Sequence, residues 1–328
     1  MFKRKISWIG LALAAVFLAL FLYRVDFGQM VQVLRKANYY YIAPAILVYF
    51  IGVWFRAVRW RLLLRSLGDF PSRRLVSPIL IGFAINNILP ARVGLIVRAY
   101  LLGIQQGVSK IASGATVVVD QLFDGLALLF FLGIIAIIIP LPAWAKATAL
   151  VSAIIFIGFF MLLLVLALSP HLTRWLVERL THWLPSRWQP GIADSVNKVL
   201  AGLAPLQRPD RIAIAFFLSL LVWAIEAGVF YLVAFSFGLG QPFPVMLLVT
   251  SISNIAITLP SLPGGIGPFE FFGKQTLTLF AVPEATATAY IAVLHIVLLL
   301  PVTLAGLGLL ALKRVSIAEA TGRNREEK

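Results

Sequence analysis

The sequence predicts an all-α polytopic membrane protein with about six full transmembrane helices plus two re-entrant helical hairpins in an inverted repeat. Three observations lead to this fold class. Hydrophobic residues make up 61% of the 328 positions, charged residues make up only 12%, and long apolar runs alternate with short basic segments. A soluble chain this apolar could not cover its own surface, so the composition excludes a cytosolic enzyme and a disordered protein.

The first predicted segment, residues 1–38, contains a transmembrane helix and an external amphipathic piece. Lys3-Arg4-Lys5 precedes an apolar run over residues 6–23. This run is longer than the core of a typical signal peptide, and no small-residue cleavage site follows it. We therefore expect a retained helix whose amino end lies in the cytoplasm.

Residues 39–169 are predicted to form the first repeat. Full spans are expected over residues 39–55, 114–139 and 147–169. The region 75–104 is predicted to be a re-entrant hairpin, because its two apolar pieces are too short to cross a hydrocarbon core of about 30 Å. A break that contains proline and glycine separates the two pieces.

The remaining chain divides into a linker, a second repeat and a tail. Residues 170–210 are predicted to form a cytoplasmic amphipathic linker, since apolar side chains recur there at helical spacing. A helix that docks a partner is the alternative for this segment. Residues 211–312 are predicted to form the second repeat, with a re-entrant hairpin over 245–281 between two full spans, and residues 313–328 a charged cytoplasmic tail.

The distribution of basic residues favours this topology. If each broken helix pair enters and leaves the membrane by the same face, most loop lysines and arginines, Arg56 and Arg59 among them, fall on one side. Positive charge marks the cytoplasmic side, so we predict a multi-pass protein of the bacterial inner (plasma) membrane with cytoplasmic N- and C-termini. No nucleic-acid-binding motif accompanies the basic clusters, and no nucleic acid is expected as a partner.

The matching breaks of the two hairpins predict a binding site. Paired breaks in inverted repeats are typical of transporter sites, and an interrupted helix must be buried in protein or line a wet cavity. Each break is followed by a helix start, whose free N–H groups and partial positive charge favour an anion. Arg92 adds a guanidinium that suits phosphate oxygens. An ion pair of Arg92 with Glu270 or Asp120 is the structural alternative.

Further candidates are polar or glycine positions within the apolar segments, where acids are costly and therefore functional candidates by default. Asp120 and Asp124 are four residues apart and share one helical face. We predict a polar path formed by Arg92, Gly94, Arg98, Asp120, Asp124, Gly264, Gly265, Gly267 and Glu270. The supporting polar residues are Asn86, Asn87, Glu226, Asn254, Lys274 and His295.

Several of these candidates also have a purely structural interpretation. Asp120 would be an interfacial residue, Glu270 would stabilise the first turn of its own helix, and His295 would be a packed, hydrogen-bonded histidine. The asparagines before the breaks would satisfy loosened backbone groups in preference to a ligand.

Other chemistries are excluded by what the sequence lacks. There is no cysteine and there are only three histidines, so we expect no thiol chemistry, no metal and no cofactor. The glycine run over 264–267 lacks the Lys-Ser/Thr of a phosphate loop and follows no strand, which excludes nucleotide binding. No order of serine, histidine and aspartate suggests hydrolysis.

Four stretches of the chain resemble one family. They are Arg59-Trp60 with Leu62-Leu63-Leu64, the run from Asn86 to Gly94 with Arg98, Asp124-Gly125-Leu126-Ala127-Leu128, and the run from Leu262 to Glu270. Together they are similar, over nearly the whole chain, to the transmembrane region of lysylphosphatidylglycerol synthetases and its stand-alone flippase-like relatives. The resemblance implies lipid translocation between leaflets, with a phospholipid, a polyprenyl-linked lipid or a hopanoid as the partner.

Two positions depart from the family pattern. The acid that usually follows the glycine of the first hairpin is replaced by Leu95, and a Glu-Arg pair of the next helix is replaced by Asp120-Gln121. These changes alter a charge pair and with it the expected coupling mechanism and head group. The sequence also shows no aminoacyl-transfer domain, so we expect no enzymatic activity.

The sequence therefore predicts a lipid flippase or translocase that moves an anionic or polar-headed lipid between leaflets. One alternative is a non-transporting, lipid-binding subunit that scaffolds a lipid- or glycolipid-synthesis pathway, with a lipid-synthesis enzyme as its partner. A second alternative is an ion-coupled solute transporter. No oligomeric state is predicted.

Overall fold

The computed structural model describes residues 2–23, 25–90, 92–183, 188–259 and 261–312. Within these ranges the chain consists of helices, turns and short loops, and contains no strand. The all-α class predicted from the sequence is therefore confirmed. The predicted charged tail, residues 313–328, lies outside the described residues.

The membrane-spanning part is built from long apolar helices. Within the described residues, five are long and apolar enough to cross a membrane: α3 (Ile42–Leu64, preceded by a turn over Tyr39–Tyr41), α6 (Lys110–Ile138), α7 (Ala143–Leu168), α10 (Pro209–Ser236) and α13 (Glu284–Leu312). Helices α1 (Phe2–Leu22) and α2 (Phe27–Lys36) meet at 80°, and this pair makes a sixth span if it is counted as one broken crossing. The chain thus has the multi-pass character that its hydropathy predicts.

Helices α4 (Ser72–Ile88) and α5 (Val93–Gln106) fold back on each other as a hairpin. Their backbones approach so closely that a Cβ atom added at Gly94 would lie 1.9 Å from the carbonyl oxygen of Gly82. Only glycine permits this contact. The break between the two helices falls where the proline and Arg92 stand in the sequence, as predicted.

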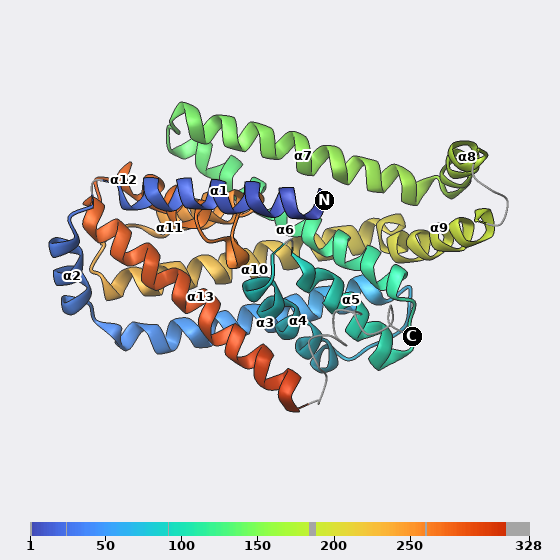
Figure 1. Ribbon diagram of the computed structural model, residues 1–328, viewed down its shortest axis with the longest axis horizontal. Coiled ribbons are helices and arrows are strands. Elements are labelled where there is room, and N and C mark those ends of the chain that lie inside the picture. The colour runs from blue at the N-terminus through green and yellow to red at the C-terminus, as the bar shows by residue number, and fades with distance from the viewer. Residues whose placement is uncertain (1, 24, 91, 184–187, 260, 313–328) are drawn as a thin grey trace.

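Helices α11 (Phe243–Ala256) and α12 (Pro268–Thr278) form a second hairpin around a longer loop, which includes the short turn η3 (Pro263–Gly265). Here Gly273 faces the hydroxyl of Ser253, 2.9 Å from the position of its missing Cβ. The turn η3 packs against α4, so the two hairpins meet at their tips. In Figure 1 the second hairpin lies toward the end of the molecule that carries α2. The inverted repeat and the re-entry of the hairpins into a membrane stay predictions.

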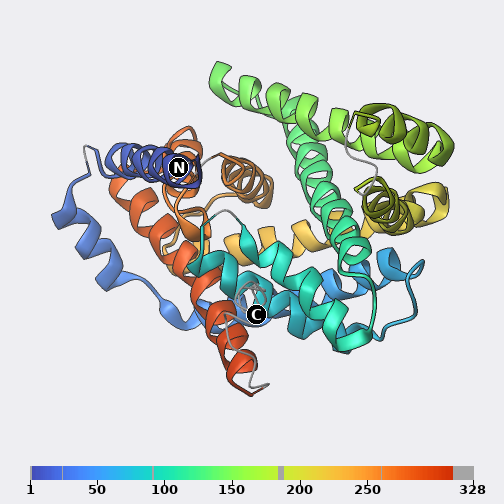
Figure 2. The same ribbon diagram turned by 45° about the vertical axis from the view of Figure 1, so that its right-hand side comes forward.

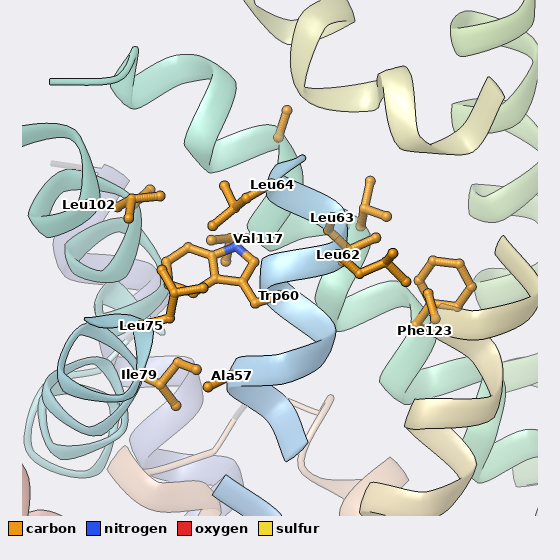
Figure 3. Close-up of a cluster of buried hydrophobic side chains, with 14 of the residues drawn as sticks. Ala57, Trp60, Leu62, Leu63, Leu64, Leu75, Ile79, Leu102, Val117 and Phe123 are labelled. Atoms are coloured by element: carbon orange, nitrogen blue, oxygen red, sulfur yellow. The ribbon is translucent and has the colours of Figure 1, made fainter. Parts of the chain in front are cut away.

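The main apolar core surrounds Trp60 on α3 (Figure 3). Its indole is completely buried and donates a hydrogen bond from Nε1 to Thr116 Oγ1 at 3.0 Å. Leu75 and Ile79 from α4 pack in the same cluster. Because the indole is a large group held on several sides, it fixes the rotation of α3 about its axis. This rotation directs the polar side of α3 toward α6 and α10.

The linker predicted over residues 170–210 is helical. It consists of α8 (Pro170–Thr181), α9 (Gln189–Leu203) and a short turn η2 (Ala204–Gln207). Figures 1 and 2 show α8 and α9 at the end of the molecule opposite α2, and α7 as a helix at the edge of the bundle. The exposed face of α8 carries Leu172, Trp175 and Leu176, as expected for an amphipathic helix.

One sequence assignment is corrected by α3. The predicted span ends at residue 55, but the helix continues to Leu64, so Arg56 and Arg59 lie within it and are buried. Their assignment to the basic residues of a cytoplasmic loop is wrong. The positive-inside rule alone does not distinguish a loop arginine from one that is turned inward against buried acids.

Candidate functional site

A cavity of about 1760 Å³ lies between the two hairpins and helices α3, α6, α7, α10 and α13. Its walls combine apolar side chains, such as Phe83, Phe156 and Leu298, with a set of polar groups. Nine of the residues predicted from the sequence line it: Asn86, Asn87, Arg92, Asp124, Glu226, Asn254, Gly264, Gly265 and His295. The other six lie outside its lining: Gly94, Arg98, Asp120, Gly267, Glu270 and Lys274.

Arg92 stands at the tip of the first hairpin, immediately before α5. Its backbone adopts the left-handed conformation, with φ 53° and ψ 34°, which is uncommon for a residue other than glycine and is often seen at functional sites. The exposed side chain donates from Nη2 to the carbonyl oxygen of Ile257, at 3.0 Å, in the loop of the second hairpin. Within the described residues it forms no ion pair, so the predicted alternative of a pair with Glu270 or Asp120 is wrong.

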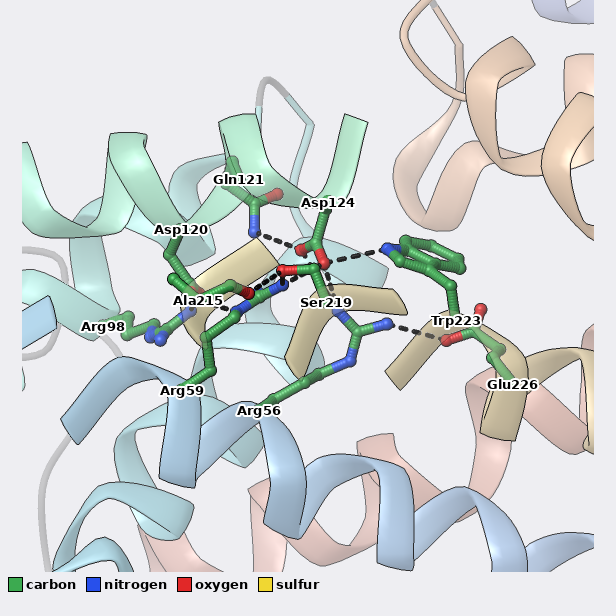
Figure 4. Close-up of polar contacts among 10 residues, drawn as sticks. All are labelled: Arg56, Arg59, Arg98, Asp120, Gln121, Asp124, Ala215, Ser219, Trp223 and Glu226. Atoms are coloured by element: carbon green, nitrogen blue, oxygen red, sulfur yellow. Dashed lines mark hydrogen bonds and ion pairs between the residues drawn. The ribbon is translucent and has the colours of Figure 1, made fainter. Parts of the chain in front are cut away.

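Deeper in the protein, three arginines and three acids alternate in a continuous series of contacts (Figure 4). We call this series the ion-pair chain; its members in order are Arg98, Asp120, Arg59, Asp124, Arg56 and Glu226. The five N···O distances along it are 2.7, 2.7, 2.7, 3.1 and 2.8 Å. The three positive and three negative charges balance, which lowers the cost of burying charge in an apolar interior.

The two ends of the ion-pair chain differ in their surroundings. At the inner end Arg98 is 3% exposed and stacks on the Trp60 ring, with its Cζ atom 3.8 Å from the ring centroid. At the other end Arg56, Asp124 and Glu226 line the cavity. The ion-pair chain therefore connects the buried core around Trp60 to the wall of the cavity.

Asp124 is the acid of the ion-pair chain with the most hydrogen-bond partners. It accepts hydrogen bonds from Arg59 at 2.7 Å, from the Trp223 indole at 2.9 Å and from Arg56 at 3.1 Å. Gln121 makes a longer contact of 3.4 Å. The helical spacing that placed Asp120 and Asp124 on one face is confirmed, because both acids face arginines of α3.

Both helix starts after the breaks are capped from within the protein. The N–H of Gly94 donates to Asn86 Oδ1 at 2.7 Å, and the N–H of Gly267 donates to Glu270 Oε2 at 2.7 Å. The prediction that these helix starts offer free N–H groups to an anion is therefore wrong for these two donors. The other role considered for Glu270, stabilising the first turn of its helix, matches its position.

Glu270 also bonds to a histidine on α13, outside the second hairpin. Its Oε1 atom lies 2.5 Å from Nδ1 of His295, whose Nε2 is 3.0 Å from the carbonyl oxygen of Gly264. The imidazole stacks on Phe269 with ring centroids 4.1 Å apart. His295 is thus the packed, hydrogen-bonded histidine of the structural interpretation, and it holds the glycine turn in place. Lys274 is directed away from the cavity and donates to the carbonyl oxygen of Phe21 at 2.8 Å.

The asparagines near the breaks bond to groups of the protein, and Asn86 bonds to the backbone at the break itself. Besides the contact of Asn86, the amide of Asn87 donates to Thr303 Oγ1 at 2.8 Å and makes a 3.5 Å contact with the carbonyl oxygen of Leu299. Asn254 donates to the carbonyl oxygen of Thr250 at 3.0 Å. Since all three also line the cavity, they present the remaining atoms of their amides to whatever enters it.

Sequence reasoning missed Arg56 and Arg59 as members of the site. A signal for them was present, because the two arginines are three residues apart on one helical face, as Asp120 and Asp124 are four apart on another. Complementary spacings of this kind on two apolar helices indicate paired charges across a helix interface.

These features define a polytopic helical membrane protein whose two broken helical hairpins close around a partly polar cavity. The family model described as "Lysylphosphatidylglycerol synthase TM region" matches residues 7–306 of the chain. The protein therefore belongs to this family, which confirms the resemblance drawn from the sequence.

The chain is similar to proteins of several archaea. A UPF0104 membrane protein of Methanothermobacter thermautotrophicus is 27% identical over 281 residues, which cover 80% of this chain and 82% of the relative. The UPF0104 membrane protein PH1989 of Pyrococcus horikoshii is 22% identical over 80% of this chain and 83% of the relative. "Glycosyltransferase AglD" of Haloferax volcanii is 24% identical, over 97% of this chain but only 56% of the relative.

Proposed function

We propose that this protein moves a polar-headed, anionic lipid between the leaflets of its membrane, with the head group held in the central cavity. The observation that carries the proposal is the position of Arg92. Its guanidinium is exposed at the point where the two hairpin tips meet, and its protein partner is a carbonyl oxygen instead of a carboxylate. A phosphate oxygen is a stronger acceptor for a guanidinium than a neutral carbonyl.

The size and lining of the cavity fit a lipid better than a small solute. Its volume of about 1760 Å³ exceeds the range of about 300–1,000 Å³ that is common for small-molecule sites. The mixture of a few polar groups with many apolar ones suits a molecule with a charged head and apolar chains. The solute-transporter alternative fits this lining less well.

The lengths of the hairpin helices support re-entry into the membrane. At a rise of about 1.5 Å per residue, the 14 residues of α5 and the 11 residues of α12 reach only about 21 and 16 Å. Neither length crosses a hydrocarbon core of about 30 Å. We infer that both hairpins dip to mid-membrane and return, which would bring Arg92 and the glycine turn to the centre of the bilayer. No enzymatic activity is part of this proposal.

The proposal is tested by lipid exchange in proteoliposomes made with fluorescently labelled phosphatidylglycerol, with dithionite added outside to report the label's leaflet. Arg92→Asn is the informative variant, because asparagine tolerates the left-handed backbone while it removes the charge. A charge-assisted hydrogen bond is worth about 1.5–3 kcal/mol, so exchange should slow about 10- to 100-fold. Arg92→Lys should retain part of the activity.

Arg73→Ala is the matched control, since Arg73 is an exposed arginine at the far end of the same hairpin. It should exchange lipid at the wild-type rate. Equal rates for wild type and Arg92→Asn, with both proteins folded by gel filtration, would refute the proposed role of Arg92. No exchange by the wild-type protein would refute translocation itself.

The relative named as a glycosyltransferase favours a second candidate function. This chain corresponds to little more than half of that relative, whose remaining length lies outside the match. A membrane part joined to a glycosyltransferase suggests a lipid-binding subunit that presents a lipid to a synthesis enzyme. This function predicts lipid binding in the cavity without exchange by the purified protein, whereas translocation requires both.

A further inference from the structure

Glu226, at the end of the ion-pair chain, depends on a single partner. Arg56 bonds two acids at once, with Nη1 directed to Asp124 and Nη2 to Glu226. Asp124 keeps Arg59 and the Trp223 indole as additional donors, whereas Glu226 has Arg56 as its single hydrogen-bond partner among the described residues. Removing the contact with Arg56 would therefore leave Asp124 well satisfied and Glu226 without a cation.

Both partners in this last link belong to the wall of the cavity. Arg56 and Glu226 are each 8% exposed, and both line the cavity together with Tyr49 and Arg92. Arg56 is held in place by the rings of Trp223 and Phe83, with its Cζ atom 4.9 and 5.8 Å from their centroids. A phosphate in the cavity could thus compete with Glu226 for Nη2 while the arginine stays where it is.

The charge balance determines the outcome of such competition. The ion-pair chain is neutral as it stands, and Arg92 lies in the same cavity at the hairpin tip, where it bonds to Ile257, so a phosphodiester that takes Nη2 of Arg56 would leave the buried carboxylate of Glu226 as an excess negative charge without a cation. A carboxylate separated from its cation in such surroundings is strongly disfavoured and becomes neutral by taking up a proton. Protonation of Glu226 removes the excess charge and, at the same time, the competitor for the guanidinium.

The other groups around Glu226 do not provide this neutralisation. Arg56 and Tyr49 face it from α3 and Asp124 from α6, and none of these would supply a second positive charge. From α13, His295 lines the same cavity but is bonded to Glu270, and Tyr290 donates to the carbonyl oxygen of Phe230.

The remaining elements packed against α10 supply no further charge. Helix α11 carries no ionisable residue, and neither does the turn η2. The tyrosines of the turn over Tyr39–Tyr41 lie toward the carboxyl end of α10, where Asn38 bonds to Ser236.

We propose that Glu226 is a proton-binding site coupled to the lipid site: an anionic head group displaces it from Arg56, and the carboxylate takes one proton from water as the lipid binds. The inference rests on the proposed function and deepens it, because it names the ion that accompanies the lipid. The step is a simple protonation, in which Glu226 carboxylate and H⁺ give the carboxylic acid. Uptake of one anion with one proton leaves the net charge of the cavity unchanged.

The experiment counts protons during lipid binding. The full-length protein in dodecyl maltoside is titrated with dihexanoyl-phosphatidylglycerol in a calorimeter at pH 7.5, in two buffers with different heats of ionisation. The wild type should take up about one proton per lipid bound, and the dissociation constant should rise about tenfold per pH unit as pH increases. Glu226→Gln should bind the lipid without proton uptake and with an affinity that does not depend on pH.

Glu178→Gln is the control, because Glu178 is an exposed glutamate on α8, outside the cavity lining. It should take up protons as the wild type does. Lipid binding by the wild type without proton uptake would overturn this inference and leave the proposed function standing, as would unchanged uptake by Glu226→Gln. Absence of lipid binding by the folded wild type would instead refute the proposed function. The number of protons that the wild type takes up per lipid bound tests the inference even if the Glu226→Gln variant fails to fold.

Discussion

The close contact between α4 and α5 makes a graded prediction about glycine substitutions. A methyl group added at Gly94 would lie 1.9 Å from the carbonyl oxygen of Gly82 and 2.6 Å from Oδ1 of Asn86. The carbonyl oxygen of Gly82 is a backbone atom and cannot rotate away, so the two helices of the hairpin must separate. A methyl group added at Gly82 would lie 2.9 Å from the carbonyl oxygen of Gly94, which is a milder clash.

The expected magnitude for Gly94→Ala combines two losses. Overpacking typically costs about 1–3 kcal/mol, and loss of the hydrogen bond from Gly94 to Asn86 costs about 1 kcal/mol more. We therefore expect the free energy of unfolding to fall by about 2–4 kcal/mol for Gly94→Ala and by less for Gly82→Ala. At Gly133 on α6 nothing lies within 4 Å, so alanine there should stabilise the helix by up to about 1 kcal/mol.

The free energy of unfolding is measured by titrating the purified variants from dodecyl maltoside into SDS and following the loss of helix packing by tryptophan fluorescence. The expected order of stability is Gly133→Ala, wild type, Gly82→Ala and Gly94→Ala. Equal stabilities of Gly94→Ala and Gly133→Ala would show that the hairpin helices do not approach as closely as described. The reasoning from the α4–α5 contact would then fail.

Four further substitutions test other contacts, the first three by the same titration and the last by proteolysis. Asp120→Asn should lower the free energy of unfolding by about 3–5 kcal/mol, because it breaks two buried ion pairs, whereas Asp69→Asn at an exposed pair should leave it unchanged. Glu270→Gln should lower it by about 1–3 kcal/mol, since one carboxylate oxygen bonds to Gly267 in the second hairpin and the other to His295 on α13, and wild-type stability would contradict that role. Lys274→Met should loosen α1, seen as faster proteolysis before Phe21, because its ammonium holds the carbonyl oxygen at the end of that helix.

Much of the fold follows from hydropathy and from the positions of proline and glycine. Long apolar runs have one stable form in a bilayer, so the five long helices were predictable from length and composition. The breaks near Arg92 and at the glycine run 264–267 were visible because proline and glycine interrupt the apolar runs there, and in the structure Arg92, Gly264, Gly265 and Gly267 all have positive φ angles. The meeting of the two tips was expected from the matching breaks, and the bond from Arg92 to Ile257 places them together.

The arrangement of charge was less predictable. The sequence places Arg98, Asp120 and Asp124 in apolar segments, but it does not say which arginine meets which acid. That choice depends on the rotation of α3, which is set by the packing of Trp60 in three dimensions. The sequence also did not decide which groups cap the two helix starts. The carboxylate of Glu270 can accept a hydrogen bond from the first turn of its own helix as readily as it could face a ligand.

The contact between the hairpin tips has a mechanical consequence. Arg92 belongs to the first half of the chain and Ile257 to the second, and a single hydrogen bond of 3.0 Å joins them at the cavity. While this bond holds, the tip of the first hairpin is joined to the loop of the second. An anion that draws the guanidinium away would break this contact, so that binding of an anion and separation of the two tips would be linked by one side chain.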